Sequence, residues 1–459
     1  MNHSRWLAGA TLILGLASPP ICVAQTSDTL RLSLLEVEER AMHHSPLLAP
    51  SVAALNVAEA KRTQADHAGN LPTFTLRNLT GVLPRRRLLE TENGVAFSPD
   101  TASGFSDLRP FNDLEISLVQ PLWTFGRLGG VLRAADAGVT ASEAAVLAKE
   151  AEVRMQVRSL YWGLKLGAEV LQVVEDARRE SLRAEEMVTT KLEEGSEEVT
   201  QTDLFKVQVF RYQVEKRYRE AQRKSALAQR ALASAIGLEE NTPLAPTDEP
   251  LDLMTFILDS LANYQAIAME SRPELRQLDA GIRARSALSS VTSADYYPTI
   301  FLGGQFRLNR AMDRADPRNP FLFNQTNFSR MGAVLGLSMN LNFQQTRDKA
   351  RIARREEELL SAQVVPARAG VRLEVEKAWR EAEEAVSNVA GSTEALKATD
   401  NWLRSEAQVF DLGLGEVKDF IDAFQAHSTM RAEHAENIAA FNTAIAALGR
   451  AIGRDLYRQ

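Results

Sequence analysis

The chain contains few residues whose type and spacing would support catalysis or metal binding. His427 and His434 lie seven positions apart on one face of a predicted helix, but no third ligand accompanies them, so surface positions are favoured over a metal site. Carboxylates are plentiful, yet none form an obvious acid–base pair, and there is no Gly-x-Ser-x-Gly, Walker or His-Glu-x-x-His motif. We therefore predict that the protein is not an enzyme and uses no metal ion or cofactor.

The composition narrows the class of protein further. The chain has 459 residues, of which 45% are hydrophobic, as in folded proteins. Its 53 basic and 60 acidic residues give a formal charge of −7, which argues against a nucleic-acid partner. Cys22 is the only cysteine, which excludes a disulfide framework and any cysteine-ligated zinc or iron–sulfur site.

The first residues predict export from the cytoplasm. Arg5 precedes the short apolar run Trp6–Leu16, and a small-residue pattern follows, so we expect a cleaved signal peptide over residues 1–24. A lipid anchor on Cys22 stays open as an alternative. No later stretch is apolar over the roughly 18 residues that a membrane helix needs. The mature protein is therefore expected to be secreted, periplasmic or in the outer membrane.

Short sequences of the first half recur in the second half in the same order, which predicts an internal duplication. The matching pairs are Ser45-Pro46 with Arg272-Pro273, Leu71-Pro72 with Tyr297-Pro298, Val153-Arg154 with Val371-Arg372, and Ala235-Ile236-Gly237 with Ala451-Ile452-Gly453. We assign the first repeat to residues 25–237 and the second to 251–459. The segment between them, 238–250, contains three prolines and four acidic residues and is predicted to be a linker.

Each repeat is predicted to contain two strands. The first repeat has strand character over 73–81 and 114–123, with a long exposed loop over 83–112. In the second repeat, apolar and small or polar residues alternate from Ala333 to Phe343. A period of two places one face of the sheet against an apolar medium and the other against water.

The strands are followed by very long helices. Arg127–Glu194 contains no proline, and Arg347–Asp411 is interrupted only by Pro366, where we expect a kink. Each helix is then roughly 100 Å long at 1.5 Å per residue. The returning helix of the first repeat carries an apolar seam from Leu204 to Ala235, which predicts coiled-coil packing.

Four strands in one chain cannot close a membrane barrel, and open strand edges are not tolerated in lipid. The strand pairs are therefore either pooled between two, three or four chains, or they form a small soluble sheet that caps a helical bundle. The residues alone leave both alternatives open.

Three segments together resemble one known family. They are the strand-to-helix junction Leu118–Arg127, the turn at Gly195 followed by Thr202-Asp203-Leu204, and the second turn Gly413–Ala423. With the duplication, they make the chain similar to the TolC-like outer-membrane efflux proteins, also called outer membrane factors. The resemblance implies a mainly α protein with a small β part, whose homotrimer forms one 12-stranded β-barrel continued by an α-helical coiled-coil barrel.

The family resemblance also implies a location and partners. The barrel would lie in the lipid of the outer membrane and the helices would form a long periplasmic tunnel. The tunnel would join a periplasmic adaptor protein and an inner-membrane transporter, and would pass substrates out of the cell without chemistry of its own. A soluble periplasmic coiled-coil scaffold or adaptor without a membrane barrel remains the alternative.

The resemblance implies a pore constriction at the periplasmic tip. Asp419 and Asp422 match the family's Asp-x-x-Asp pair, which would place rings of carboxylates around a narrow lumen and attract cations. Alternatively, both residues only favour the start of the returning helix, where acidic groups offset the helix dipole.

The resemblance also points to the two helix turns. Asp203 matches a gating residue that in the family bonds to a tyrosine and an arginine, but the corresponding positions here are Phe410 and Gly415, so we do not expect that latch. The turns at Gly195, Gly413 and Gly415 are candidate adaptor contacts, although a glycine that only ends a helix is equally consistent with the sequence.

Overall fold

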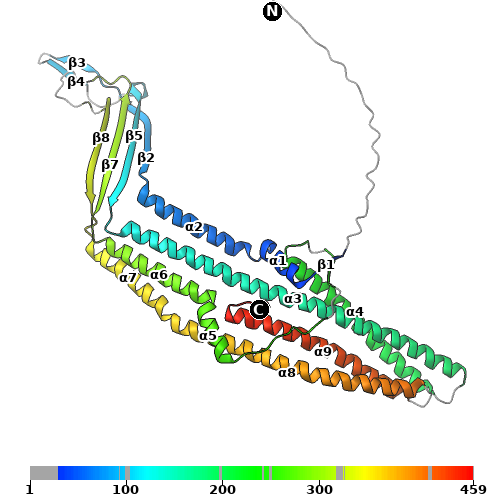
Figure 1. Cartoon of the computed structure of the whole chain (residues 1–459). Coiled ribbons are helices and arrows are strands. Elements are labelled where there is room, and N and C mark those ends of the chain that lie inside the picture. The colour runs from blue at the N-terminus through cyan, green and yellow to red at the C-terminus, as the bar shows by residue number, and fades with distance from the viewer. Residues whose placement is uncertain are drawn as a thin grey trace, which may run out of the picture.

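The computed structural model describes residues 29–91, 94–98, 104–195, 199–239, 242–247, 251–316, 324, 326–411 and 416–457. The predicted signal peptide, Gly413 and Gly415 lie outside these residues. The described chain is elongated, with a sheet at one end and long helices that extend from it to the other end (Figure 1). The protein is mostly helical with a small sheet part, as predicted.

The main sheet contains four long antiparallel strands in the order β2-β5-β7-β8. They are β2 (Thr73–Pro84), β5 (Leu108–Trp123), β7 (Thr299–Ala311) and β8 (Phe328–Ser338). The central pair, β5 and β7, joins the two halves of the chain. The outer edges of β2 and β8 pair with no other strand in the described part of the chain.

The two faces of this sheet differ, as the period-two pattern predicted. Residues paired across neighbouring strands point to the same face, so the register assigns each side chain to a face. One face is apolar and carries Phe74, Leu76, Leu114, Ile116, Leu118, Leu302, Phe306, Leu308, Met331, Leu335 and Leu337. Much of it is exposed, with Leu76 at 68% and Met331 at 85%. The opposite face carries most of the charged residues, Arg77, Asp113, Glu115, Arg307 and Arg330, beside apolar residues such as Leu79, Val119 and Val334.

The strand limits differ from the predicted ones at two places. The expected loop over 83–112 includes a small hairpin of β3 (Leu88–Thr91) and β4 (Gly94–Phe97), and β5 already begins at Leu108. In the second half, β8 ends at Ser338 rather than at Phe343. There the side chain of Asn340 accepts a hydrogen bond from the backbone of Asn342 at 2.9 Å, so the backbone turns before the next helix.

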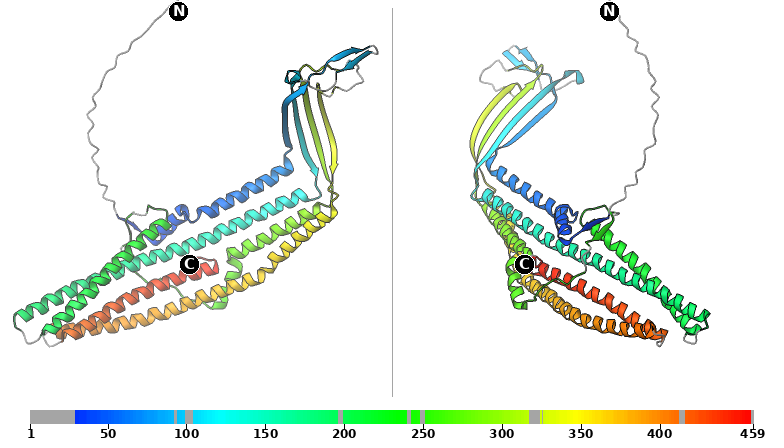
Figure 2. Two further views of the ribbon diagram at one scale, coloured as in Figure 1. Left: turned by 180° about the vertical axis from the view of Figure 1, so that it is seen from behind. Right: turned by 45° about the vertical axis from the view of Figure 1, so that its right-hand side comes forward.

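Next to the sheet, four helices lie in the same order as the strands to which they are connected. They are α2 (Ala49–Asn70), α3 (Arg127–Glu193), α6 (Pro273–Ala294) and α7 (Phe343–Ala362), in the order α2-α3-α6-α7. Figure 2 shows this arrangement from two further sides. At the joint, Phe125 stacks on Tyr297 with ring centroids 5.3 Å apart.

Farther from the sheet, the helices are arranged in the order α4-α3-α9-α8. They are α4 (Gln201–Ala235), α9 (Val417–Ile452), α8 (Val364–Asp411) and the continuing α3. Because α3 is unbroken over 67 residues, it runs the full length of the helical part. Sheet and helices thus form three successive groups of four elements, each with two open edges.

The predicted kink in the second long helix is a break between α7 and α8 at Gln363. The break lies three residues before Pro366. Proline donates no backbone hydrogen bond and its ring clashes with the carbonyl four residues earlier, here that of Ala362. The helix therefore ends at that residue and starts again.

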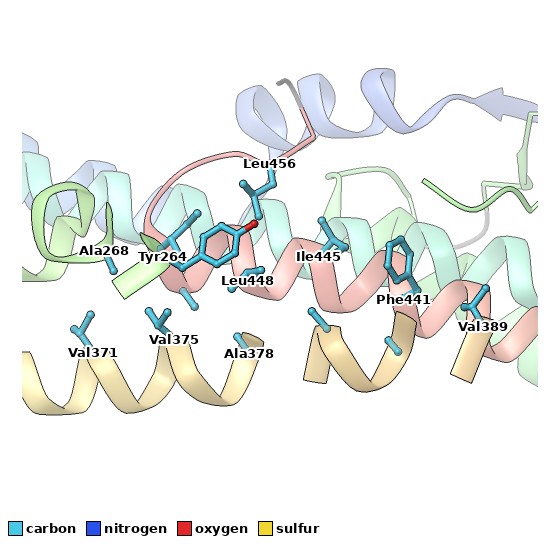
Figure 3. Close-up of a cluster of buried hydrophobic side chains, with 14 residues drawn as sticks. Tyr264, Ala268, Val371, Val375, Ala378, Val389, Phe441, Ile445, Leu448 and Leu456 are labelled. Carbon is cyan, nitrogen blue, oxygen red and sulfur yellow. The ribbon is translucent and has the colours of Figure 1, made fainter. Parts of the chain in front are cut away.

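Smaller elements surround the middle of the helical part. They are β1 (Leu30–Leu32), α1 (Leu34–His44), β6 (Leu244–Pro246) and α5 (Leu261–Ser271). β6 pairs in parallel with β1, and Leu244 is only 2% exposed. The predicted linker 238–250 therefore contributes to the core, which its prolines and acidic residues did not suggest. On the other side, α5, α8 and α9 enclose an apolar cluster around Tyr264, Val375 and Phe441 (Figure 3).

A buried ionic network joins the two halves at this level. The guanidinium of Arg158 on α3 contacts the carboxylates of Glu38 on α1 at 2.5 Å and of Asp455 at 2.8 Å. The ring of Tyr457 lies 4.0 Å from the same guanidinium, and burial raises the pKa of the Tyr457 hydroxyl to about 12. The C-terminal residues are thereby fixed against the first half.

No helix in the described ranges is both long enough and apolar enough to cross a membrane.

Candidate functional site at the helix tips

The two helix turns meet at the end of the molecule opposite to the sheet (Figures 1 and 2). One is the connection from α3 to α4 and the other is the connection from α8 to α9. Of the residues that the sequence singled out as a gate and as partner contacts, Gly195, Asp203, Asp419 and Asp422 lie at this end. Gly413 and Gly415 lie outside the described residues.

Gly195 ends the first long helix. Its φ of +73° lies in the left-handed region, and its N–H donates to the carbonyl of Leu192 at 3.2 Å. A Cβ at this position would meet no atom within 4 Å, so backbone conformation and not space favours glycine. The prediction of a helix turn here is confirmed, whereas adaptor contact at Gly195 stays a prediction.

Asp203 caps the start of its own helix, α4. Its carboxylate accepts hydrogen bonds from the backbone N–H of Thr200 at 3.1 Å and from the Thr200 hydroxyl at 2.6 Å. The Asp203 N–H donates back to that hydroxyl at 3.3 Å, which completes a capping box. These bonds, together with Lys206 at 2.9 Å, lower the pKa of Asp203 below its ordinary value.

Asp419 and Asp422 lie in the first turns of α9 and are both exposed. They point away from the buried residues of this helix segment, Val417, Ile421 and Phe424. The Asp422 carboxylate lies 3.4 Å from the Lys418 ammonium. Both carboxylates are thus accessible to solvent and to neighbouring chains.

An aromatic cluster lies at the tip of the helical hairpins. Phe410 at the end of α8 stacks on Phe420 of α9, with ring centroids 5.1 Å apart, and Phe210 of α4 packs edge-on against Phe424 at 6.2 Å. Phe410 is only 8% exposed. The two helical hairpins are therefore joined at the tip by apolar contacts.

A polar contact joins the same hairpins farther from the tip. The guanidinium of Arg431 on α9 donates to Asp176 and to Glu169 on α3, both at 3.0 Å. Between these helices and α4 lies a groove of about 620 Å³ with an apolar floor that includes Val173, Ala177 and Val214.

The two histidines on α9 have separate surroundings. The Nδ1 atom of His434 lies 2.9 Å from the Ser392 hydroxyl, and burial lowers the pKa of both His427 and His434. Within the part of the chain that the structure describes, no group of three or more His, Cys, Asp or Glu side chains could hold a metal ion.

Sequence reasoning missed most of the aromatic cluster and the ion pairs of Arg431. A signal was present, because Phe420 and Phe424 are four residues apart and therefore share one face of the returning helix. The contact of Phe424 with Phe210 joins segments about 200 residues apart, which periodicity cannot pair. The contact of Phe420 with Phe410 joins the two sides of the second turn.

The sequence matches no protein-family profile and no curated protein. The fold, in contrast, matches solved outer-membrane channels over almost the whole chain. The open-state MtrE channel of Neisseria gonorrhoeae has 15% identity and a TM-score of 0.71, covering 97% of this chain and 98% of its own. CusC, with 16% identity and a TM-score of 0.72, covers 93% of this chain and 94% of its own.

A third structure, the outer membrane protein VceC of Vibrio cholerae, has 16% identity and a TM-score of 0.68, covering 92% of this chain and 96% of its own. The chain thus has the TolC-like fold of outer membrane factors, and the predicted resemblance is confirmed at the level of the fold. The proteins that share it are described as channels and not as enzymes.

Proposed function

We propose that the chain is one protomer of a homotrimeric outer-membrane channel that passes substrates from an inner-membrane transporter to the cell exterior. One observation carries this proposal. The sheet and both groups of helices contain four elements each, in matching order, and each group is open at both edges. A layer with two open edges can be completed by further copies of itself.

The open edges of the helices are suited to contact with another copy. On α4, Tyr212 is 71% exposed and lies outside the groove that Phe205 and Val209 line with Ile421 of α9. On the α8 edge, Leu373 and Trp402 are 68% and 43% exposed. Exposed apolar side chains along a helix mark an interaction surface. Contact between α4 of one copy and α8 of the next would bury them.

The sheet is suited to lipid in the same arrangement. Pairing of β8 with β2 of the next copy leaves no strand edge open and gives twelve strands for three copies. From Ile300 to Leu308 the apolar face extends about 27 Å along β7 at about 3.4 Å per residue. That length is comparable with the apolar band of outer-membrane barrels, about 25 Å.

The duplication gives a simple account of this arrangement. The main elements follow in the same order in residues 25–237 and 251–459, namely two helices, two long strands, a long helical segment and a returning helix. In the second half the long segment is divided into α7 and α8. We propose that each repeat supplies one strand pair and one helical hairpin. The trimer then contains six such units around one axis.

At the tip, Asp419 and Asp422 of three chains would place six carboxylates around the lumen. Their exposure on α9 supports this role, because a buried pair could not face a pore. The turns at Gly195, Gly413 and Gly415 would contact a periplasmic adaptor protein. The groove between α3, α4 and α9 offers a helical partner an additional apolar surface.

A cysteine pair tests the trimer directly. Tyr212 and Trp402 lie on opposite edges and at similar distances along the chain from the two helix turns. The expected mature chain has no cysteine, so Tyr212→Cys with Trp402→Cys should form disulfides only between subunits. Oxidation should yield a covalent trimer on a non-reducing gel, and each single variant should not.

Fractionation and conductance test the membrane function. The protein should stay in the outer membrane after a salt wash, and the detergent-purified protein should conduct ions across a planar bilayer. Release as a water-soluble monomer would contradict the proposal and favour a soluble periplasmic scaffold or adaptor.

A further inference from the structure

The polar face of the sheet carries a row of charged residues that crosses all four strands. Arg77 on β2 is paired with Glu115 on β5, Glu115 is paired with Arg307 on β7, and Arg307 is paired with Arg330 on β8. Directly paired residues lie on the same face, about 5 Å apart from strand to strand. The four charges therefore form one continuous row.

The neighbouring row adds the carboxylate of Asp113, which is already hydrogen-bonded to Arg307. Asp113 is buried and accepts two hydrogen bonds from the Arg307 guanidinium, at 2.9 and 2.6 Å. Glu115 accepts a hydrogen bond from the Gln305 amide at 2.7 Å. In these two rows, three arginines face two carboxylates, so each chain has one positive charge in excess.

The excess charge lies toward the two edges of the sheet. Arg77 takes part in no ion pair between described residues, and its side chain is exposed. Arg330 is also exposed, and its guanidinium lies 5.3 Å from the ring of Phe328. The carboxylates, in contrast, lie on the central strand β5.

The apolar face of the sheet determines which way the charged row points, and this step rests on the proposed function. If the apolar face is in contact with lipid, the charged row faces the water-filled lumen. Joining β8 of one copy to β2 of the next brings Arg330 close to Arg77 at every subunit boundary. Three copies place nine arginines and six carboxylates around the pore at this level.

We propose that these residues form an arginine belt that gives the strand-lined part of the duct a preference for anionic solutes. The arginines remain charged at every physiological pH, and their planar guanidinium groups match carboxylates and phosphates. The substrate class best suited to the belt is therefore a small molecule with a carboxylate or phosphate group. The tip carries the opposite charge on Asp419 and Asp422, so a solute passes two regions of opposite sign.

Ion selectivity in a planar bilayer tests this inference. The reversal potential under a potassium chloride gradient gives the permeability ratio of potassium to chloride for each protein. In the double variant Arg77→Gln with Arg330→Gln, this ratio should rise roughly twofold, because six positive charges leave the lumen. Block of the current by inorganic pyrophosphate should weaken in the same variant.

Arg310→Gln is the matched control, since Arg310 lies on β7 but is paired with Asn112 on the opposite face. Its permeability ratio should equal that of the wild type. The single variant Arg77→Gln removes no ion pair and should show a smaller rise in the same direction. It provides the test even if the double variant does not assemble.

The outcomes separate this inference from the proposed function. A conducting channel whose ratio is unchanged in Arg77→Gln, or changes equally in Arg310→Gln, overturns the arginine belt and leaves the channel intact. A purified wild-type protein that does not conduct contradicts the channel itself and the belt with it.

Discussion

Phe410 and Phe420 stack at the tip with an interplanar angle of 17° and thereby connect the end of α8 to the start of α9. Phe420 also lies 6.2 Å from Phe424, which contacts Phe210 on the other hairpin. A contact of this kind contains no ionisable group. Any movement of the hairpins relative to one another must therefore separate aromatic surfaces.

Phe410→Ala should loosen the tip. Removing a buried phenyl ring costs about 3 kcal/mol through lost burial and the remaining cavity. We expect faster protease cleavage near the turns and a higher conductance in bilayers. Leu227→Ala, at an exposed apolar residue on α4, is the control and should change the cleavage rate less. Equal cleavage of Phe410→Ala and wild type would show that the Phe410 ring does not stabilise the tip.

Asp203→Ala should fray the start of α4 without separating the hairpins. Loss of a capping interaction costs about 1 kcal/mol. Because the pKa of Asp203 is lowered in the folded state, its contribution is present at neutral pH and disappears as the pH falls through that lowered value. Hydrogen exchange of the amides of 201–206 measures the effect. Faster exchange in α8 as well would indicate that Asp203 also stabilises the second hairpin.

Arg158→Gln should strongly destabilise the middle of the molecule. The change removes the guanidinium that contacts the carboxylates of Glu38 and Asp455 in a largely buried place, which costs about 3 kcal/mol. Burial alone raises the pKa of Asp455. The hydrogen bonds from Arg158 and the Tyr457 backbone, together with the charges of Arg158 and Arg154, outweigh burial and hold that pKa below its ordinary value. The stabilisation is therefore present at neutral pH and is lost on acidification.

Denaturant unfolding at several pH values tests this expectation. The difference between wild type and Arg158→Gln should narrow as the pH falls below about 4, because the protonated Asp455 carboxyl no longer needs the cation. Arg62→Gln breaks an exposed pair with Asp136 and should cost less than about 0.5 kcal/mol. A constant difference at all pH values would argue against the ionic origin.

Asp419→Ala combined with Asp422→Ala should weaken block of the channel by a trivalent cation. Both carboxylates are exposed, so their removal should leave the fold unchanged, and the apparent affinity of the blocker should fall roughly tenfold. Glu215→Gln on α4, whose carboxylate contacts Arg178 and Arg219, is the control. Unchanged block in the double variant would remove Asp419 and Asp422 from the pore.

The sequence predicted the long elements well because their periods are strong. The predicted strands over 73–81 and 114–123 lie within β2 and β5. The helix predicted over 127–194 starts at the same residue as α3 and ends one residue after it. The end of β8 was missed because apolar alternation continues past Ser338 to Phe343. There a side-chain hydrogen bond, not the alternation, decides the backbone conformation.

The contacts at the site were harder to predict than the elements. Within the predicted seam from Leu204 to Ala235, the structure buries Phe210 and leaves the neighbouring Arg211 exposed, paired with Glu185 at 3.0 Å. The capping of α4 was detectable, since Thr200 and Asp203 have the spacing of a capping box. The pairing of Phe410 with Phe420 depends on the path of the chain through the second turn, which local patterns do not determine.

The break at Gln363 makes the two halves of the protein mechanically unequal. On one side, the single rod of α3 would transmit a push or twist applied at the tip up to the sheet. On the other side, the interruption between α7 and α8 provides a joint that absorbs part of the same load. Bending of the duct should therefore concentrate in the second half of each chain.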